Sequence, residues 1–147
     1  MFKCCCEDAQ AHPQIAEFVK FVENLTNGET LDFTHVSSLP FMAYWKSLCI
    51  IEFVPEKNDF RFRLWGTELA EIFERDQTGK MMCDIYPEER YKTLHELHTD
   101  ALNDMETICA SGNLDWMDRE HAKWHQVTMP MMRNGKITET LSYLLFE

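Results

Sequence analysis

The sequence predicts an α+β domain in which one antiparallel sheet packs against helices. Strands and helices are segregated along the chain, as one helix, two strands, several helices and then three strands, and this order favours antiparallel pairing in a single sheet. Residues Phe60 to Leu64 alternate strictly between apolar and charged side chains, which is typical of a half-buried strand. Asn134-Gly135 separates two β-rich runs and is a strong hairpin signal.

The first element is predicted as an amphipathic helix from Pro13 to about Leu25. Proline suits the first helical position, and Asn27-Gly28 is a good stop signal. Such a short helix is marginal alone in water, so its apolar stripe must be buried on the chain's own sheet or against a second copy in a homodimer. We expect the homodimer. The stripe consists of Ile15, Phe18, Val22 and Leu25.

The middle of the chain is predicted to hold a short helix near Pro40 and then a hairpin. Two β-rich runs, Leu48–Val54 and Phe60–Trp65, flank a polar turn. A helical stretch from Thr67 to about Phe73 follows. Gly66 and Gly79 each end a periodic segment, so both are expected to adopt backbone angles that favour glycine.

The longest helix is predicted from about Glu88 to Cys109, because acidic residues follow Pro87 and complement the positive end of the helix dipole. Three strands are then expected, at 114–117, 124–132 and 137–146. The inward stripe of the long helix comprises Tyr91, Leu94, His98, Ala101, Met105 and Ile108.

Length and charge limit the possible functions. The chain has 147 residues, which suits one domain. We expect a disordered, cysteine-containing tail over residues 1–12, the first helix and a connection over 13–37, and the main domain over 38–147. The net charge of −11 argues against binding nucleic acid or anionic membranes. Without an apolar span or a secretory signal, the expected location is the cytoplasm.

The six cysteines fit a reducing compartment. Those at 49, 83 and 109 stand singly among apolar residues, so we interpret them as free thiols that act as small hydrophobic side chains. The adjacent Cys4, Cys5 and Cys6 are expected in an oxidisable tail. Lipidation and metal capture remain open alternatives for these three.

The run FRFRLWGTELAEIFERDQTGK, Phe60 to Lys80, resembles the "fryRl-G-t-i…g-d-l-t-G" core of a bacterial PAS-domain subfamily, chiefly small stand-alone proteins of alphaproteobacteria. The segment ending in Met129-Pro130-Met131 resembles that family's "lPL" step. The resemblance covers about residues 38–147. Arg75 and Met131 depart from the pattern. The resemblance implies a five-stranded antiparallel sheet, with the helices between its second and third strands packed across one face.

Catalytic and metal-binding templates are not matched. There is no nucleophile elbow, phosphate-binding glycine loop or paired-carboxylate pattern, so we expect no enzyme activity. His95 and His98 are three residues apart, and His121 and His125 are four apart, but neither pair has a third ligand at a matching spacing. We therefore expect no metal site, and haem ligation is only a minor alternative for His98.

Two function classes remain. In the first, a sensory domain binds a small apolar molecule in an internal pocket and signals through a protein partner. In the second, a ligand-free module serves dimerisation or partner binding. We favour the first. The expected pocket walls are Phe62, Leu64, Ile72, Phe73, Met82, Tyr91, Leu94, His98 and Trp124.

Overall fold

The computed structural model describes residues 2–4, 12–114 and 119–147. Seven strands form one sheet in the order β1-β5-β6-β7-β3-β4, and β2 pairs with β6 beside this row. The strands are β1 Phe2–Cys4, β2 Leu31–Asp32, β3 Leu48–Val54, β4 Asp59–Trp65, β5 Ile108–Leu114, β6 Arg119–Arg133 and β7 Lys136–Phe146. The helices are α1 Pro13–Thr26, α2 Phe33–Val36, η1 Leu39–Ser47, η2 Pro55–Lys57, α3 Thr67–Phe73, η3 Met82–Asp84 and α4 Glu88–Asn103, where η marks a 3₁₀ helix.

The α+β class is confirmed, but the sheet is larger than predicted. The five longer strands pair antiparallel. Two short strands extend this group: β1 pairs antiparallel with β5, and β2 pairs parallel with β6. The sheet is therefore mixed. Residues Phe2–Cys4, expected in a disordered tail, form an edge strand because β5 offers them a free ladder of backbone groups.

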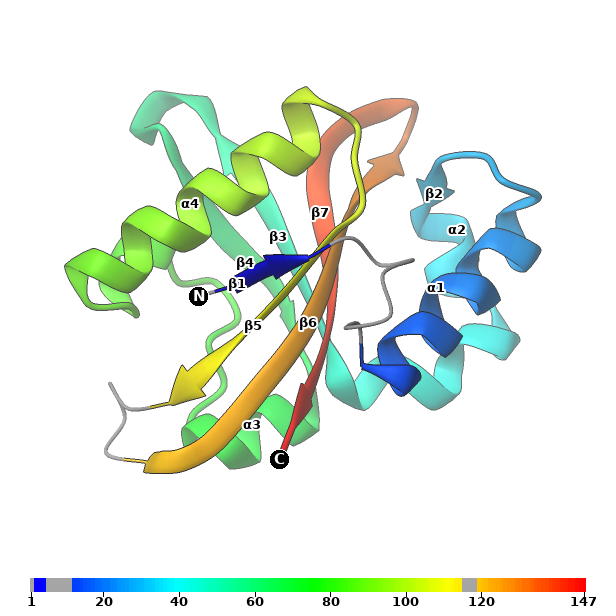
Figure 1. Cartoon of the computed structure of the whole chain (residues 1–147). Coiled ribbons are helices and arrows are strands. Elements are labelled where there is room, and N and C mark those ends of the chain that lie inside the picture. The colour runs from blue at the N-terminus through cyan, green and yellow to red at the C-terminus, as the bar shows by residue number, and fades with distance from the viewer. Residues whose placement is uncertain (1, 5–11, 115–118) are drawn as a thin grey trace.

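Helices cover both faces of the sheet, whereas we expected them on one. Helix α4 crosses one face, and α1 with α2 lies against the other (Figure 1). Side chains alternate along each strand, so the sheet has two cores. In β6, Trp124 belongs to the core on the α4 side, and Val127 and Met129 belong to the core on the α1 side.

Helix α1 confirms the predicted start and stop, since its C-cap Asn27 has a φ of 55°. Ile15, Phe18 and Val22 are buried, and Phe18 stacks on Tyr143 of β7 with ring centroids 4.4 Å apart. Leu25 packs on the same core. The stripe thus caps its own sheet, so its assignment as the dimer surface is wrong for this structure. The homodimer itself stays a prediction.

The hairpin β3–β4 and helix α3 lie where the sequence predicted them. Asn134 and Gly135, with φ values of 52° and 77°, form the predicted turn between β6 and β7. One side chain departs from the predicted alternation. A bulge in the β3–β4 pairing lies between Ile50 and Ile51, and beyond it Leu64 is exposed while Trp65 is buried.

Helix α4 is shorter than predicted. It ends at Asn103, and Met105 has a φ of 51°, which turns the chain back toward the sheet. Ile108 and Cys109 consequently belong to β5 and not to the helical stripe. Cross-strand pairing with β6 overrides the helical spacing here. Of the strand predicted over 114–117, only Leu114 is described, and it lies in β5. Residues 115–118 lie outside the described part of the chain.

The two glycines flanking α3 have different roles. Gly79 has a φ of 88°, as predicted. Gly66 has an ordinary φ of −61°, so the prediction of special backbone angles there is wrong. It is a glycine for a different reason: an added Cβ would overlap the backbone carbonyl group of Lys46. Close packing of η1 on the start of α3 therefore requires glycine at this position.

Candidate ligand-binding cavity

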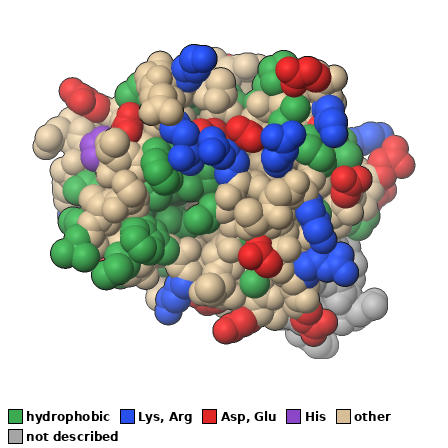
Figure 2. Space-filling model, turned by 180° about the vertical axis from the view of Figure 1, so that it is seen from behind, with side chains coloured by type: hydrophobic (Ala, Val, Ile, Leu, Met, Phe, Trp, Pro, Cys, Tyr) green, Lys and Arg blue, Asp and Glu red, His purple; other side chains and the backbone are tan. Residues whose placement is uncertain are grey.

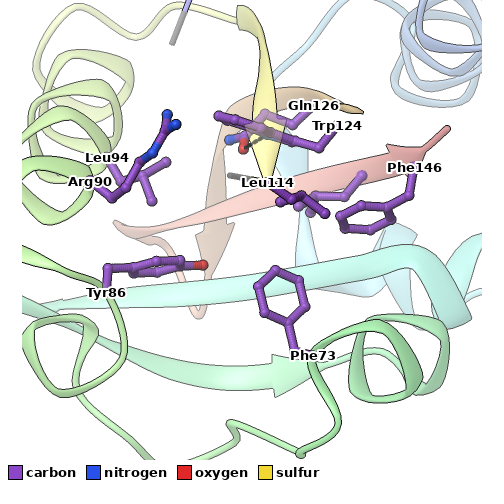
Figure 3. Close-up of a pocket in the computed structure, with 9 residues that line it drawn as sticks. Phe73, Tyr86, Arg90, Leu94, Leu114, Trp124, Gln126 and Phe146 are labelled. Carbon is purple, nitrogen blue, oxygen red and sulfur yellow. Dashed lines mark hydrogen bonds between the residues drawn. The ribbon is translucent and has the colours of Figure 1, made fainter. Parts of the chain in front are cut away.

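Two small cavities lie in the core between α4 and the sheet. The first, here called the Trp124 cavity, has a volume of about 30 Å³ and is walled by helices α3 and α4 and by the ends of β5, β6 and β7 (Figure 3). It is lined by Phe73, Tyr86, Arg90, Leu94, Leu114, Trp124, Gln126, Leu144 and Phe146.

The second, the His98 cavity, has a volume of about 20 Å³ and shares the side chains of Tyr86, Leu94, Gln126 and Leu144 with the first. The two cavities are therefore neighbouring parts of one loosely packed region. The His98 cavity is lined by Cys49, Ile51, Phe62, Trp65, Met82, Tyr86, Leu94, His98, Gln126, Ser142 and Leu144.

A buried chain of hydrogen bonds runs along the sheet beneath these cavities. The indole N–H of Trp124 donates to Gln126 Oε1 at 2.8 Å (Figure 3). Gln126 Nε2 in turn donates to Thr128 Oγ1 at 2.8 Å. The hydroxyls of Thr128 and Ser142 are 2.7 Å apart. Because buried polar groups are costly unless paired, this chain orients Gln126 on the cavity wall.

Trp124 occupies its position because the opposite residue has no side chain. Gly112 of β5 pairs with Trp124 of β6, and a Cβ on Gly112 would overlap the indole ring. The ring therefore lies over the backbone of β5, and Arg90 of α4 covers it with its guanidinium carbon 5.6 Å from the ring centroid.

His98 is a neutral core histidine. Its Nδ1 lies 2.8 Å from Thr140 Oγ1 on β7, and the side chain is buried. Burial, with a smaller contribution from the neighbouring His95, lowers the pKa of His98 to about 3. At neutral pH the ring can exchange hydrogen bonds but carries no charge.

Trp65 contributes a buried polar atom. Its indole N–H is buried and has no hydrogen-bond partner among the described residues. The side chain lines the His98 cavity. An unpaired buried donor costs stability, so it is an indication that another group binds there.

The cavities in this structure are small. A water molecule needs roughly 10–15 Å³ of such space, so each cavity holds one or two waters, and neither has room for a haem. A larger molecule requires the walls to move apart. Met82 is unbranched and can adopt other shapes at low cost, and it lines the His98 cavity.

Six of the nine predicted wall residues line these cavities: Phe62, Phe73, Met82, Leu94, His98 and Trp124. Leu64 does not, because it is exposed beyond the β3–β4 bulge. Ile72 packs on the same core without reaching a cavity. Tyr91 lines a separate surface hollow with Asn58 and His95.

Sequence reasoning missed the polar side of the site. Gln126, Thr128, Thr140 and Ser142 are buried, although polar residues usually mark an exposed strand face. The available signal was their spacing. Gln126 and Thr128 are two residues apart, as are Thr140 and Ser142, so the members of each pair share one face of a strand.

The free thiols are not activated. Burial raises the pKa of Cys49, and a hydrogen bond to Asp59, together with burial, raises the pKa of Cys83 to about 11. Cys109 was predicted to be free, but it is disulfide-bonded. Because disulfides are rare in a reducing cytosol, the cytoplasmic location stays an untested prediction.

The His95 and His98 pair does not converge on one point. His95 Nε2 lies 2.8 Å from the Asn58 carbonyl oxygen, at the surface, while His98 points into the core. His121 lies in β6, but its side chain is outside the part of the chain that the structure describes. Among the described residues, a different group has metal-binding geometry: His12, His125 and Glu147, whose ligand atoms lie within 4.8 Å of one another.

Comparison with known proteins identifies no family for this chain. No family model matches it, and no curated protein matches it at a significant level. No helix in the described ranges is both long enough and apolar enough to cross a bilayer. The internal site geometry is therefore the basis for any statement about function.

Proposed function

We propose that this chain is a PAS-like sensory domain that binds a small, largely apolar molecule between α4 and the sheet and signals through a partner protein. The arrangement of elements supports the resemblance. Five antiparallel strands form most of the sheet, in the order β5-β6-β7-β3-β4, and α3, η3 and α4 lie in the chain between the second and third of these strands, β4 and β5. Helix α4 packs across one face (Figure 1).

The observation that carries the proposal is the buried, unpaired indole N–H of Trp65, a residue whose side chain lines the His98 cavity. Aromatic and aliphatic groups surround this donor, and Gln126 adds an amide on the shared wall of the two cavities. A complementary ligand has an apolar body and at least one hydrogen-bond acceptor, since specificity in such pockets comes from a few polar groups.

Binding such a ligand separates α4 from the sheet, because the existing cavities hold only one or two waters. The helix contacts β6 and β7 through Leu94, Leu97, His98 and Ala101, which are its buried residues. A ligand that displaces α4 therefore changes the surface that this helix presents. This coupling supplies a signal to a partner without any catalytic step.

Phenol and toluene provide a matched test because they are similar in size and only phenol carries an oxygen acceptor. We expect both to bind Leu144→Ala more tightly than wild type, since this change enlarges both cavities. Leu141→Ala is the matched control, as Leu141 is buried on the opposite face of β7.

The hydrogen bond to Trp65 should make the ratio of phenol affinity to toluene affinity about 2- to 10-fold higher in Leu144→Ala than in the double variant that also carries Trp65→Phe. The ratio is compared because the phenol hydroxyl also costs free energy to remove from water. Equal binding to Leu144→Ala and Leu141→Ala, measured by calorimetry, would place the binding elsewhere. An affinity ratio that Trp65→Phe leaves unchanged would refute the role of the indole.

The ligand-free interaction module remains the second candidate, because one helix exposes an apolar ridge. Leu39, Met42 and Trp45 are 75%, 50% and 40% exposed. They recur every three residues along η1 and so align on one side of this 3₁₀ helix. Figure 2 shows hydrophobic side chains gathered at the lower left of the rear face. A wild-type chain that light scattering finds monomeric at high concentration would rule out a second copy on this ridge.

A further inference from the structure

Three side chains from distant parts of the sequence meet on the sheet face opposite the cavities. His12 is the N-cap of α1, His125 lies in β6, and Glu147 follows the last residue of β7. Glu147 Oε1 lies 2.9 Å from His12 Nε2, and Glu147 Oε2 lies 3.4 Å from His125 Nε2. The two imidazole ring centroids are 4.8 Å apart.

We propose that His12, His125 and Glu147 form a binding site for a first-row divalent transition-metal ion such as Zn²⁺. Two imidazoles and one carboxylate are the ligand types that suit such ions, and three protein ligands leave a coordination position open for water. The site is independent of the proposed function. Trp124 and Gln126 line the cavities on the α4 face of the sheet. Because side chains alternate along a strand, His125, which lies between these two residues, projects from the opposite face, where α1 packs.

The backbone positions two of the ligands firmly. The backbone N–H of Glu147 donates to the Lys123 carbonyl oxygen at 2.8 Å, and the Lys123 N–H donates to the Glu147 carbonyl oxygen at 3.0 Å. These two bonds hold the backbone that carries the Glu147 carboxylate beside β6. His125 pairs with Leu145 across β6 and β7. Ligands on paired strands keep their separation, as a preorganised metal site requires.

The hydroxyl group of Ser111 orients the ring of His125. Ser111 Oγ on β5 lies 2.7 Å from His125 Nδ1. When Nδ1–H donates to the serine oxygen, the lone pair of Nε2 faces Glu147, which is the tautomer that binds a metal. This contact gives the site the outer hydrogen bond that metal-ligating histidines normally have.

His12 needs one rearrangement to bind the metal. Its Nδ1 accepts a hydrogen bond from the Gln14 backbone N–H at 3.1 Å, so in the neutral ring the proton is on Nε2, facing Glu147. Metal binding at Nε2 places the proton on Nδ1 and breaks the cap bond. Because the Gln14 contact is exposed, water can replace it.

The surroundings favour a cation. Both imidazoles are 19% exposed and the carboxylate is 52% exposed, so the site is reachable from solvent. The net charge of −11 raises the local concentration of cations. A bound ion would tie the start of α1 to the sheet.

Titration of the full chain with Co²⁺, followed by competition with Zn²⁺, tests the site. We expect one ion per chain and an absorption spectrum without a thiolate charge-transfer band, because the ligands are nitrogen and oxygen. Glu147→Gln, His125→Asn and His12→Asn should each weaken Co²⁺ binding at least about 10-fold, and Ser111→Ala about 10- to 100-fold. Asparagine at position 12 preserves a good N-cap, so that variant should retain its fold.

His95→Asn is the matched control, because His95 is a surface histidine that belongs to no such cluster within the described ranges. The Co²⁺ affinity of this variant should equal that of wild type. A thiolate band would assign the ion to cysteines and overturn the proposal. A Co²⁺ affinity equal to wild type in both Glu147→Gln and Ser111→Ala would also overturn the proposal. This outcome does not depend on whether the histidine variants fold. Circular dichroism of each variant checks the fold.

Discussion

Lowering the pH from about 7.5 to about 5 should destabilise this protein through His98. The folded state keeps the ring neutral because burial lowers its pKa from 6.5 to about 3. The unfolded chain binds a proton at its ordinary pKa. Between these two values the unfolded state therefore holds more protons, so stability rises with pH and is lost as the pH falls below 6.5.

The magnitude follows from these two pKa values. At about pH 5 the unfolded histidine is almost fully protonated and the folded one is not, which favours unfolding by about 2 kcal/mol relative to pH 7.5. The other titratable groups lining the His98 cavity are Cys49 and Tyr86. Burial raises the pKa of both, so they stay neutral over this range.

Urea denaturation at the two pH values, in wild type and in His98→Asn, measures the effect. The asparagine does not titrate, so wild type should lose about 2 kcal/mol more than the variant on acidification. Any cavity that the substitution creates lowers stability at both pH values alike. Equal losses in the two proteins would refute the assignment of a neutral, buried His98.

Three further perturbations test the packing. Phe18→Ala should lower the free energy of unfolding by about 3–5 kcal/mol without changing the mass in solution, because Phe18 is buried in its own chain; a melting curve with light scattering checks both, and a change of mass alone would contradict the reasoning. Gly66→Ala should cost about 1–3 kcal/mol, because the new Cβ meets the Lys46 carbonyl, and an unchanged melting temperature would argue against that clash. Glu139→Gln should cost about 1.5–3 kcal/mol in urea denaturation, because the buried carboxylate accepts hydrogen bonds from Arg133 at 2.8 and 3.2 Å; a stability equal to wild type would show that the charge is not needed.

The wall residues of the candidate cavities were predictable where strand or helix periodicity alone decides which way a side chain points. Phe62 and Leu94 follow strand and helix periodicity, and both line the cavities. Leu64 follows the same alternation but is exposed, because a bulge between the partner residues Ile50 and Ile51 changes the register. A bulge depends on how two strands pair, and neither strand shows it alone.

The sequence alone was sufficient for elements whose signals are local. The start of α1 at Pro13, helix α3 and the Asn134-Gly135 turn depend on steric preferences of a few adjacent residues. Sheet pairing decided the rest. It recruited Phe2–Cys4 as an edge strand, ended α4 at Asn103, and buried the α1 stripe on its own sheet.

The same holds for the two sites. The three proposed metal ligands are separated by as many as 135 residues, so no spacing rule connects them. The unpaired indole of Trp65 is identifiable only once its neighbours are placed. Local preference acts over one or two turns of chain, whereas a site is defined by which distant groups the sheet brings within hydrogen-bond distance.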